Sequence, residues 1–142
     1  MMTAILDTNV FVQATFSPPQ SASYRTIVAH EKGRFQLIFS TDTLNELLDV
    51  LSLPRIRAHH GWSDDRILRF VLSFVADAVI HTETPIASAT LTRDVTDTKF
   101  LGLAEASDAD FLVTNDHRHL LPLRQYRNTR IVTPAQFLRA LP

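Results

Sequence analysis

The clearest indication of the fold is the stretch Thr3-Ala4-Ile5-Leu6-Asp7-Thr8-Asn9-Val10. It begins with a short apolar run that is followed by the carboxylate of Asp7. A second stretch, Asp110-Phe111-Leu112-Val113-Thr114-Asn115-Asp116, has the same arrangement. These runs lack the apolar-polar alternation of a strand with one face in water, so they are predicted to be strands buried on both faces. Such strands are typical of a parallel sheet that helices cover.

Segments of helical spacing alternate with short runs of this kind along the chain. The predicted strands are 3–6, 35–39, 78–81, 110–114 and 130–132, and the predicted helices are 21–32, 41–51, one that starts after Ser63, 97–107 and 134–141. Proline, threonine and small residues predict loops over 17–20 and 82–95. Together these elements predict an α/β fold, a three-layer α/β/α sandwich around a mainly parallel five-stranded sheet. The 142 residues suffice for one domain, 1–142, and not for two ordinary ones.

Composition excludes several classes of protein. The formal net charge of -1 excludes a globally basic nucleic-acid coat protein and leaves room for a local basic patch. The chain has no cysteine, which excludes disulfides and thiolate metal sites and fits a cytoplasmic location. No basic segment followed by an apolar core precedes Asp7, and no apolar stretch approaches ~20 residues, so we expect no membrane association. There is no glycine-rich loop with a lysine, so an ATPase is not expected.

Carboxylates follow two of the predicted strands. Asp7 and Asp116 come at strand ends, and the carboxyl ends of parallel strands share one edge of a sheet, where ligands bind. Glu46 falls in the first half of the helix after the second strand, Asp97 begins the helix before the fourth, and Asp94 lies in the loop before it. Oxygen ligands of this kind suit Mg²⁺ and Mn²⁺. The pattern therefore favours a divalent-metal site and phosphodiester chemistry.

Each of these acids also has an ordinary structural interpretation. Asp7 can cap a helix, Glu46 can be a solvated helix residue, and Asp116 can belong to a turn. Asp94 and Asp97 can be a loop residue and an N-cap. The metal-site hypothesis gains only from their combination.

Five segments in a fixed order carry a family resemblance. They are Leu6-Asp7-Thr8-Asn9-Val10, Asn45-Glu46-Leu47-Leu48-Asp49-Val50-Leu51, Asp97-Thr98-Lys99-Phe100-Leu101-Gly102-Leu103-Ala104, Ala109-Asp110-Phe111-Leu112-Val113-Thr114-Asn115-Asp116 and Arg130-Ile131-Val132-Thr133-Pro134-Ala135-Gln136-Phe137-Leu138. In these segments the chain resembles the PIN-domain ribonucleases, especially the bacterial VapC-like branch of toxin components in toxin-antitoxin pairs. The resemblance spans nearly the whole chain.

The resemblance implies a set of site residues and a reaction. The implied catalytic and metal-binding residues are Asp7, Glu46, Asp97 and Asp116, with Asp94 as an additional metal ligand and Asn9 and Thr114 as supporting residues. The implied activity is endonucleolytic hydrolysis of RNA with one or two Mg²⁺ or Mn²⁺ ions, in which an ion activates water and stabilises the leaving oxygen. The implied partners are an RNA substrate, a cognate antitoxin and a second copy of the chain in a homodimer.

The chain departs from this branch in two places. Only Asp97 follows Asp94 where the branch usually has a proline and a denser acidic run, and Asn115 stands where glycine is frequent. The first departure can weaken a second metal site. The second can change the local backbone, although asparagine also tolerates positive φ.

Candidate RNA contacts come from basic residues. Arg55 and Arg57 belong to the densest cationic stretch, beside Trp62, and such groups attract phosphates and stack bases; the alternative is a solvated helix face. Lys99 lies beside Asp97 and can meet a phosphate or balance the acids. His117 and His119 follow Asp116 and can touch a substrate.

Two other functions remain open from sequence. The first is a catalytically weak PIN-fold module that binds RNA or protein. The second is a metal-dependent phosphatase or DNA nuclease that uses the same acids.

Overall fold

A six-stranded sheet forms the centre of the computed structural model, which describes residues 1–82 and 95–142, with side chains for 1–82 and 98–142. The strands are β1 (Thr3–Leu6), β2 (Gln36–Ser40), β3 (Val79–His81), β4 (Phe111–Val113), β5 (Gln125–Tyr126) and β6 (Thr129–Val132). Their order is β3-β2-β1-β4-β6-β5, and every neighbouring pair is parallel except β5 and β6. The predicted α/β class and parallel sheet are confirmed. The predicted number of five strands is wrong, because the two residues of β5 are too few to give a periodic pattern.

Seven α-helices and one short 3₁₀ helix occupy the described part of the chain. They are α1 (Thr8–Phe16), α2 (Ala22–Glu31), α3 (Thr41–Ser52), α4 (Pro54–His60), α5 (Asp64–Val75), α6 (Val95–Ser107), η1 (Leu121–Leu123) and α7 (Pro134–Ala140). The sequence patterns did not predict α1 or α4. Pro54 lies just beyond the end of α3 and opens α4, because proline is favoured at the first position of a helix. The predicted loop 82–95 lies almost entirely outside the described residues.

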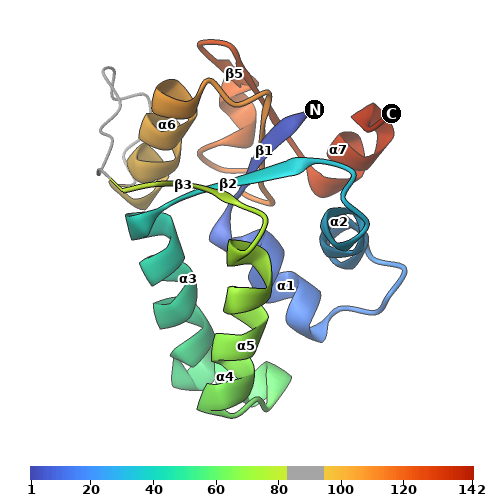
Figure 1. Cartoon of the computed structure of the whole chain (residues 1–142), viewed down its shortest axis with the longest axis vertical. Coiled ribbons are helices and arrows are strands. Elements are labelled where there is room, and N and C mark those ends of the chain that lie inside the picture. The colour runs from blue at the N-terminus through green and yellow to red at the C-terminus, as the bar shows by residue number, and fades with distance from the viewer. Residues whose placement is uncertain (83–94) are drawn as a thin grey trace.

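The sheet lies between two apolar clusters, one on each face, and with the helices on both faces it forms three layers. Ile5, Ile38, Leu112 and Ile131 pack with residues of α6, and alternate residues of the same strands pack with α1, α2, α3, α5 and α7. Figure 1 shows α6 on one side of the strands and α1, α3 and α5 on the other. Both faces of the central strands are therefore buried, which explains their unbroken apolar character. No described helix is long and apolar enough to cross a membrane.

The strand order brings the two acidic strand ends together. β1 lies between β2 and β4 in the sheet. The chain therefore leaves the sheet on either side of a topological switch point, with the helices after β1 and β2 on one side and the segment after β4 on the other. Leu6 is in register with Val113, and the backbone N–H of Asp7 donates to the Val113 carbonyl at 2.9 Å. The carboxyl ends of β1 and β4 therefore lie side by side.

Candidate metal centre

Asp7 is the buried centre of the site. Its side chain follows β1, is 7% exposed, and accepts hydrogen bonds at Oδ2 from Thr114 Oγ1 at 2.7 Å and Asn9 Nδ2 at 3.2 Å. Asp7 does occupy the N-cap position of α1, but its side chain makes no capping hydrogen bond. The carboxylate is thus oriented by β4 and by Asn9, and the ordinary role of a helix cap does not account for it.

The segment after β4 is fixed by the same hydroxyl. Thr114 is fully buried, and its Oγ1 accepts the backbone N–H of Asp116 at 2.9 Å while it donates to Asp7. Asp116 Oδ1 then accepts the backbone N–H groups of Arg118 at 3.0 Å and His119 at 3.1 Å. Thr114 therefore orients the Asp7 carboxylate and holds the backbone of Asp116. Asp116 also forms the turn that the sequence left open as its alternative role.

Glu46 reaches the site from α3. A capping box between Ser40 and Thr43 starts this helix directly at the end of β2, so Glu46 falls in its second turn. Its side chain is 14% exposed; Oε2 accepts a 2.5 Å hydrogen bond from Thr8 Oγ1, and Oε1 lies 3.5 Å from Lys99 Nζ of α6. These contacts join α1, α3 and α6 at one place.

The three carboxylates influence one another electrostatically. Burial is the largest cause that raises the pKa of Asp7 from its ordinary value of 3.8 to about 6; the hydrogen bond from Thr114 opposes this, and the negative charges of Glu46 and Asp116 add to it. Such a set of crowded carboxylates has the hard oxygen donors that Mg²⁺ and Mn²⁺ prefer, together with excess negative charge that a cation would neutralise. The donor chemistry fits a divalent ion, although no three described His, Asp or Glu side chains converge closely enough to hold one by themselves.

The remaining predicted residues divide into three groups. Asp97 lies in the first turn of α6, two residues before Lys99, and its side chain is outside the described part, as is the whole of Asp94. Arg57 is held at the junction of α4 and α5. It donates to the backbone oxygens of Ser52 at 3.3 Å and Trp62 at 3.0 Å and pairs with the Asp64 carboxylate. Arg55 is an exposed residue of α4, which follows the end of α3 away from β2.

The structure also adds residues that the sequence patterns did not indicate. Asn115 Nδ2 donates to Gln13 Oε1 at 3.1 Å and to Ser23 Oγ at 3.2 Å, and the Asn115 backbone N–H donates to Asn9 Oδ1 at 3.1 Å. Asn115 is not among the non-glycine residues with positive φ. Its amide instead ties the turn after β4 to α1 and α2. Thr8, which bonds Glu46, was detectable only as the polar residue between Asp7 and Asn9.

The fold is an α/β sandwich in which Asp7, Glu46 and Asp116 interact near the topological switch point of the sheet. Residues 3–118 match the PIN domain family, and the chain belongs to that family. A solved structure of similar fold is VapBC2 from Rickettsia felis bound to a DNA fragment from their promoter. It has 17% sequence identity and a TM-score of 0.58, and the match covers 93% of this chain and 98% of that chain. No protein of curated function matches the sequence.

Proposed function

We propose that this chain is a divalent-metal-dependent endoribonuclease that hydrolyses RNA phosphodiester bonds. Membership of the PIN domain family supports nuclease chemistry. The observation that carries the proposal is the environment of Asp7, a buried carboxylate whose pKa is raised by burial and by the charges of Glu46 and Asp116. A buried acid of this kind, beside two more acids at a sheet edge, supports a functional role over a purely stabilising one.

In the proposed mechanism, Asp7, Glu46, Asp97 and Asp116 hold Mg²⁺ or Mn²⁺, with Asp94 as a further ligand. When bound, one or two such ions supply activation of water and stabilisation of the leaving oxygen. Thr114 and Asn9 orient Asp7 through their hydrogen bonds to Oδ2. Lys99, 3.5 Å from Glu46, provides positive charge at the rim where a scissile phosphate would approach.

We further propose that the nuclease is the toxin of a type II toxin-antitoxin pair in the cytoplasm. The solved structure of similar fold is a complex of a VapB and a VapC component, which supports a protein antitoxin as partner. A homodimer is proposed on the same family grounds. Co-purification with the product of a neighbouring short gene would test the antitoxin, and light scattering of the isolated chain would test the dimer.

An RNA cleavage assay with a metal series tests the activity. Labelled RNA should be cut with Mg²⁺ or Mn²⁺ and left intact in EDTA. Asp7→Asn should abolish cleavage, whereas Asp49→Asn, an exposed carboxylate on the same helix as Glu46, should leave it unchanged. Metal-independent cleavage or a fully active Asp7→Asn would contradict the proposal.

The rival functions give different results in the same assay. RNA that is bound tightly but not cut with any divalent ion would identify a binding module. A panel of DNA and phosphate-monoester substrates separates a DNA nuclease or a phosphatase from a ribonuclease.

A further inference from the structure

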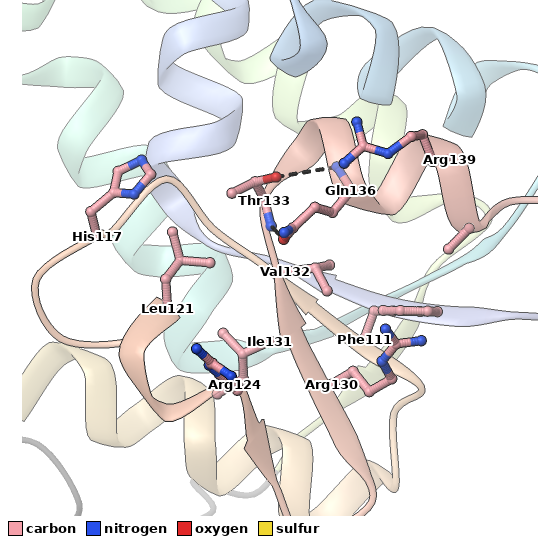
Figure 2. Close-up of a pocket in the computed structure, with 11 residues that line it drawn as sticks. Phe111, His117, Leu121, Arg124, Arg130, Ile131, Val132, Thr133, Gln136 and Arg139 are labelled. Atoms are coloured by element: carbon pink, nitrogen blue, oxygen red, sulfur yellow. Dashed lines mark hydrogen bonds between the residues drawn. The ribbon is translucent and has the colours of Figure 1, made fainter.

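A cationic pocket opens beside β6, between η1 and α7. Its volume is about 790 Å³, and its described lining includes Arg124, Arg130, Arg139 and His117 but no carboxylate. Figure 2 shows that the three arginines come from separate segments: Arg124 follows η1, Arg130 lies in β6 and Arg139 lies on α7. In a chain of net charge -1, this is a pronounced local concentration of positive charge.

These arginines are available to a ligand. All three are exposed, and none of them forms an ion pair within the part of the chain that the structure describes. Arginine presents a planar set of donors that matches phosphate oxygens in pairs. Three unpaired guanidinium groups around one cavity favour an anionic ligand, because each would otherwise only repel the others.

The backbone holds two of the arginines in defined positions. Arg124 has φ of +63°, a conformation that non-glycine residues rarely adopt, and its carbonyl accepts the N–H of Ile131 at 2.9 Å. This bond fastens the end of η1 to β6. Arg130 lies with its guanidinium carbon 5.6 Å from the centre of the Phe111 ring. The fold therefore fixes the backbone of Arg124 and the position of the Arg130 guanidinium group beside Phe111.

The pocket reaches the turn that follows Asp116. His117 lines it and directly follows Asp116, whose Oδ1 fixes the intervening turn through the N–H groups of Arg118 and His119. The lining then continues through Thr133, directly after the carboxyl end of β6, which is hydrogen-bonded to β4. A ligand extended along the pocket would thus lead to the sheet edge where the carboxylates lie.

We propose that this pocket binds consecutive phosphates of the RNA strand on one side of the scissile bond. In Figure 2 the guanidinium groups stand apart around the cavity, which suits an extended polyanion better than one small anion. The pocket would act as a substrate-binding site through Arg124, Arg130 and Arg139. This proposal rests on the proposed function, because RNA is the polyanion that the pocket would bind. An acidic peptide is the competing ligand, and the position of the lining residue His117 directly after Asp116 favours RNA over it.

Binding of single-stranded RNA in EDTA tests the pocket without cleavage. The probe is a fluorescein-labelled strand of about 20 nucleotides, followed by anisotropy against salt concentration. The triple variant Arg124→Gln, Arg130→Gln, Arg139→Gln should bind at least about tenfold more weakly, and its salt slope should fall by about 2, because each lost phosphate contact removes about 0.7. Replacement of the same residues by lysine should restore most of the salt slope but only part of the affinity.

A matched control separates the pocket from net charge. Arg25→Gln, Lys32→Gln, Arg69→Gln removes the same charge from exposed positions of α2, its carboxyl end and α5, and should change the affinity less than about threefold. Equal losses in both triple variants, or no RNA binding by the parent chain, would overturn the proposal. So would a polyglutamate probe that binds the pocket more tightly than RNA does. Thermal melts verify that each variant is folded.

Failure of the pocket proposal can be distinguished from failure of the proposed nuclease activity. Pocket-dependent RNA binding without cleavage under any metal would leave the pocket standing and refute the hydrolytic function. Cleavage that is unchanged in kcat and KM in the pocket variant would refute the pocket and leave the nuclease standing. If both proposals are correct, the pocket variant should raise KM for a long RNA more than it lowers kcat.

Discussion

The hydroxyl of Thr114 donates a 2.7 Å hydrogen bond to Oδ2 of Asp7, although the two residues are 107 positions apart in the sequence. The Oγ1 atom of Thr114 also accepts a hydrogen bond from the backbone N–H of Asp116 at 2.9 Å. One buried side chain therefore bonds the Asp7 carboxylate and the backbone of Asp116, which follow two different strands.

Removal of this hydroxyl should weaken the metal site. Thr114→Val keeps the shape of the side chain but deletes the donor to Asp7, so the pKa of Asp7 should rise further and Mn²⁺ affinity and RNA cleavage should fall by about 10-fold or more. Calorimetric titration with Mn²⁺ and the cleavage assay measure the two effects. Thr114→Ser retains the hydroxyl and serves as the control. Equal metal affinity in the valine and serine variants would remove this role from Thr114.

Asp7→Asn should stabilise the metal-free chain at neutral pH. The pKa of Asp7 in the folded chain, about 6, is above its ordinary value of 3.8. Protonated Asp7 therefore contributes stability below pH 4, and this contribution is lost as pH rises through 6. Asparagine avoids the loss, so at pH 7 in EDTA the variant should be more stable by up to about 3 kcal/mol.

Urea denaturation at pH 4 and pH 7 measures this difference. The difference between the two chains should shrink to less than about 1 kcal/mol at pH 4, because Asp7 is then protonated in the folded chain and only about half ionised in the unfolded chain. Asp49→Asn changes an exposed carboxylate of α3 and should show no such dependence on pH. A variant that is less stable than the parent at pH 7 would show that burial does not penalise the Asp7 charge.

Divalent metal should reverse the electrostatic penalty. At pH 7.5, Mn²⁺ should bind the deprotonated carboxylates and raise the melting temperature. The apparent affinity for Mn²⁺ should fall as the pH drops below about 6, because the cation then competes with the Asp7 proton. Calorimetry in buffers of different ionisation enthalpy should detect proton release at pH 6. Asp7→Asn should lose both the melting shift and the proton release.

Lys99 should affect metal and RNA in opposite directions. Its ammonium group lies 3.5 Å from Glu46 Oε1, so Lys99→Gln removes a charge that competes with a metal ion for this carboxylate. We expect Mn²⁺ to bind a few-fold more tightly and kcat/KM for RNA to fall by about tenfold, because the phosphate loses its cation. The unfolding free energy should change by less than about 1 kcal/mol, since the pair is partly exposed. Lys99→Arg should preserve both properties, and weaker metal binding by Lys99→Gln would show that Lys99 supports the ligands instead of competing with them.

Arg57 should matter for folding more than for RNA. Its guanidinium group bonds to Ser52 and Trp62 backbone oxygens and pairs with Asp64, so Arg57→Ala should lower the free energy of unfolding by about 1–2 kcal/mol. Arg55→Ala, on the exposed surface of the same helix, should stay within about 0.5 kcal/mol. Urea titrations compare the two. A specific loss of RNA affinity in Arg57→Ala, with unchanged stability, would instead support the RNA contact predicted from the sequence.

Strong apolar patterns made most of the fold predictable. The five longer strands were predictable because each contains a short apolar run. The helices from Ser21, Thr41 and Ser63 were predictable because their caps and apolar spacing agree. β5 was not predictable, because its pairing with β6 and not its composition makes it a strand. α4 was not predictable, because a proline that opens a helix looks the same in sequence as one that follows the end of the previous helix.

The site was predictable only in part, for a geometric reason. Parallel strands bring their ends to one edge, so the positions of Asp7 and Asp116 followed from the sequence pattern alone. The contacts of Glu46 with Thr8 and of Asn115 with Ser23 depend on how α1, α2 and α3 pack, which no local pattern encodes. The cationic pocket likewise assembles arginines from three segments without a motif, whereas the sequence drew attention to the denser basic run around Arg57.

The pairing of β1 with β4 has a consequence for the synthesis of the protein. Asp7 is translated more than a hundred residues before the strand and the hydroxyl that position it, and the carbonyl of Val132 in β6 in turn accepts the backbone N–H of Thr114. The carboxylates of Asp7 and Asp116 therefore come together only after β4 has been translated and has paired with β1. The environment that orients Asp7 is complete only when β4 and β6 have both joined the sheet.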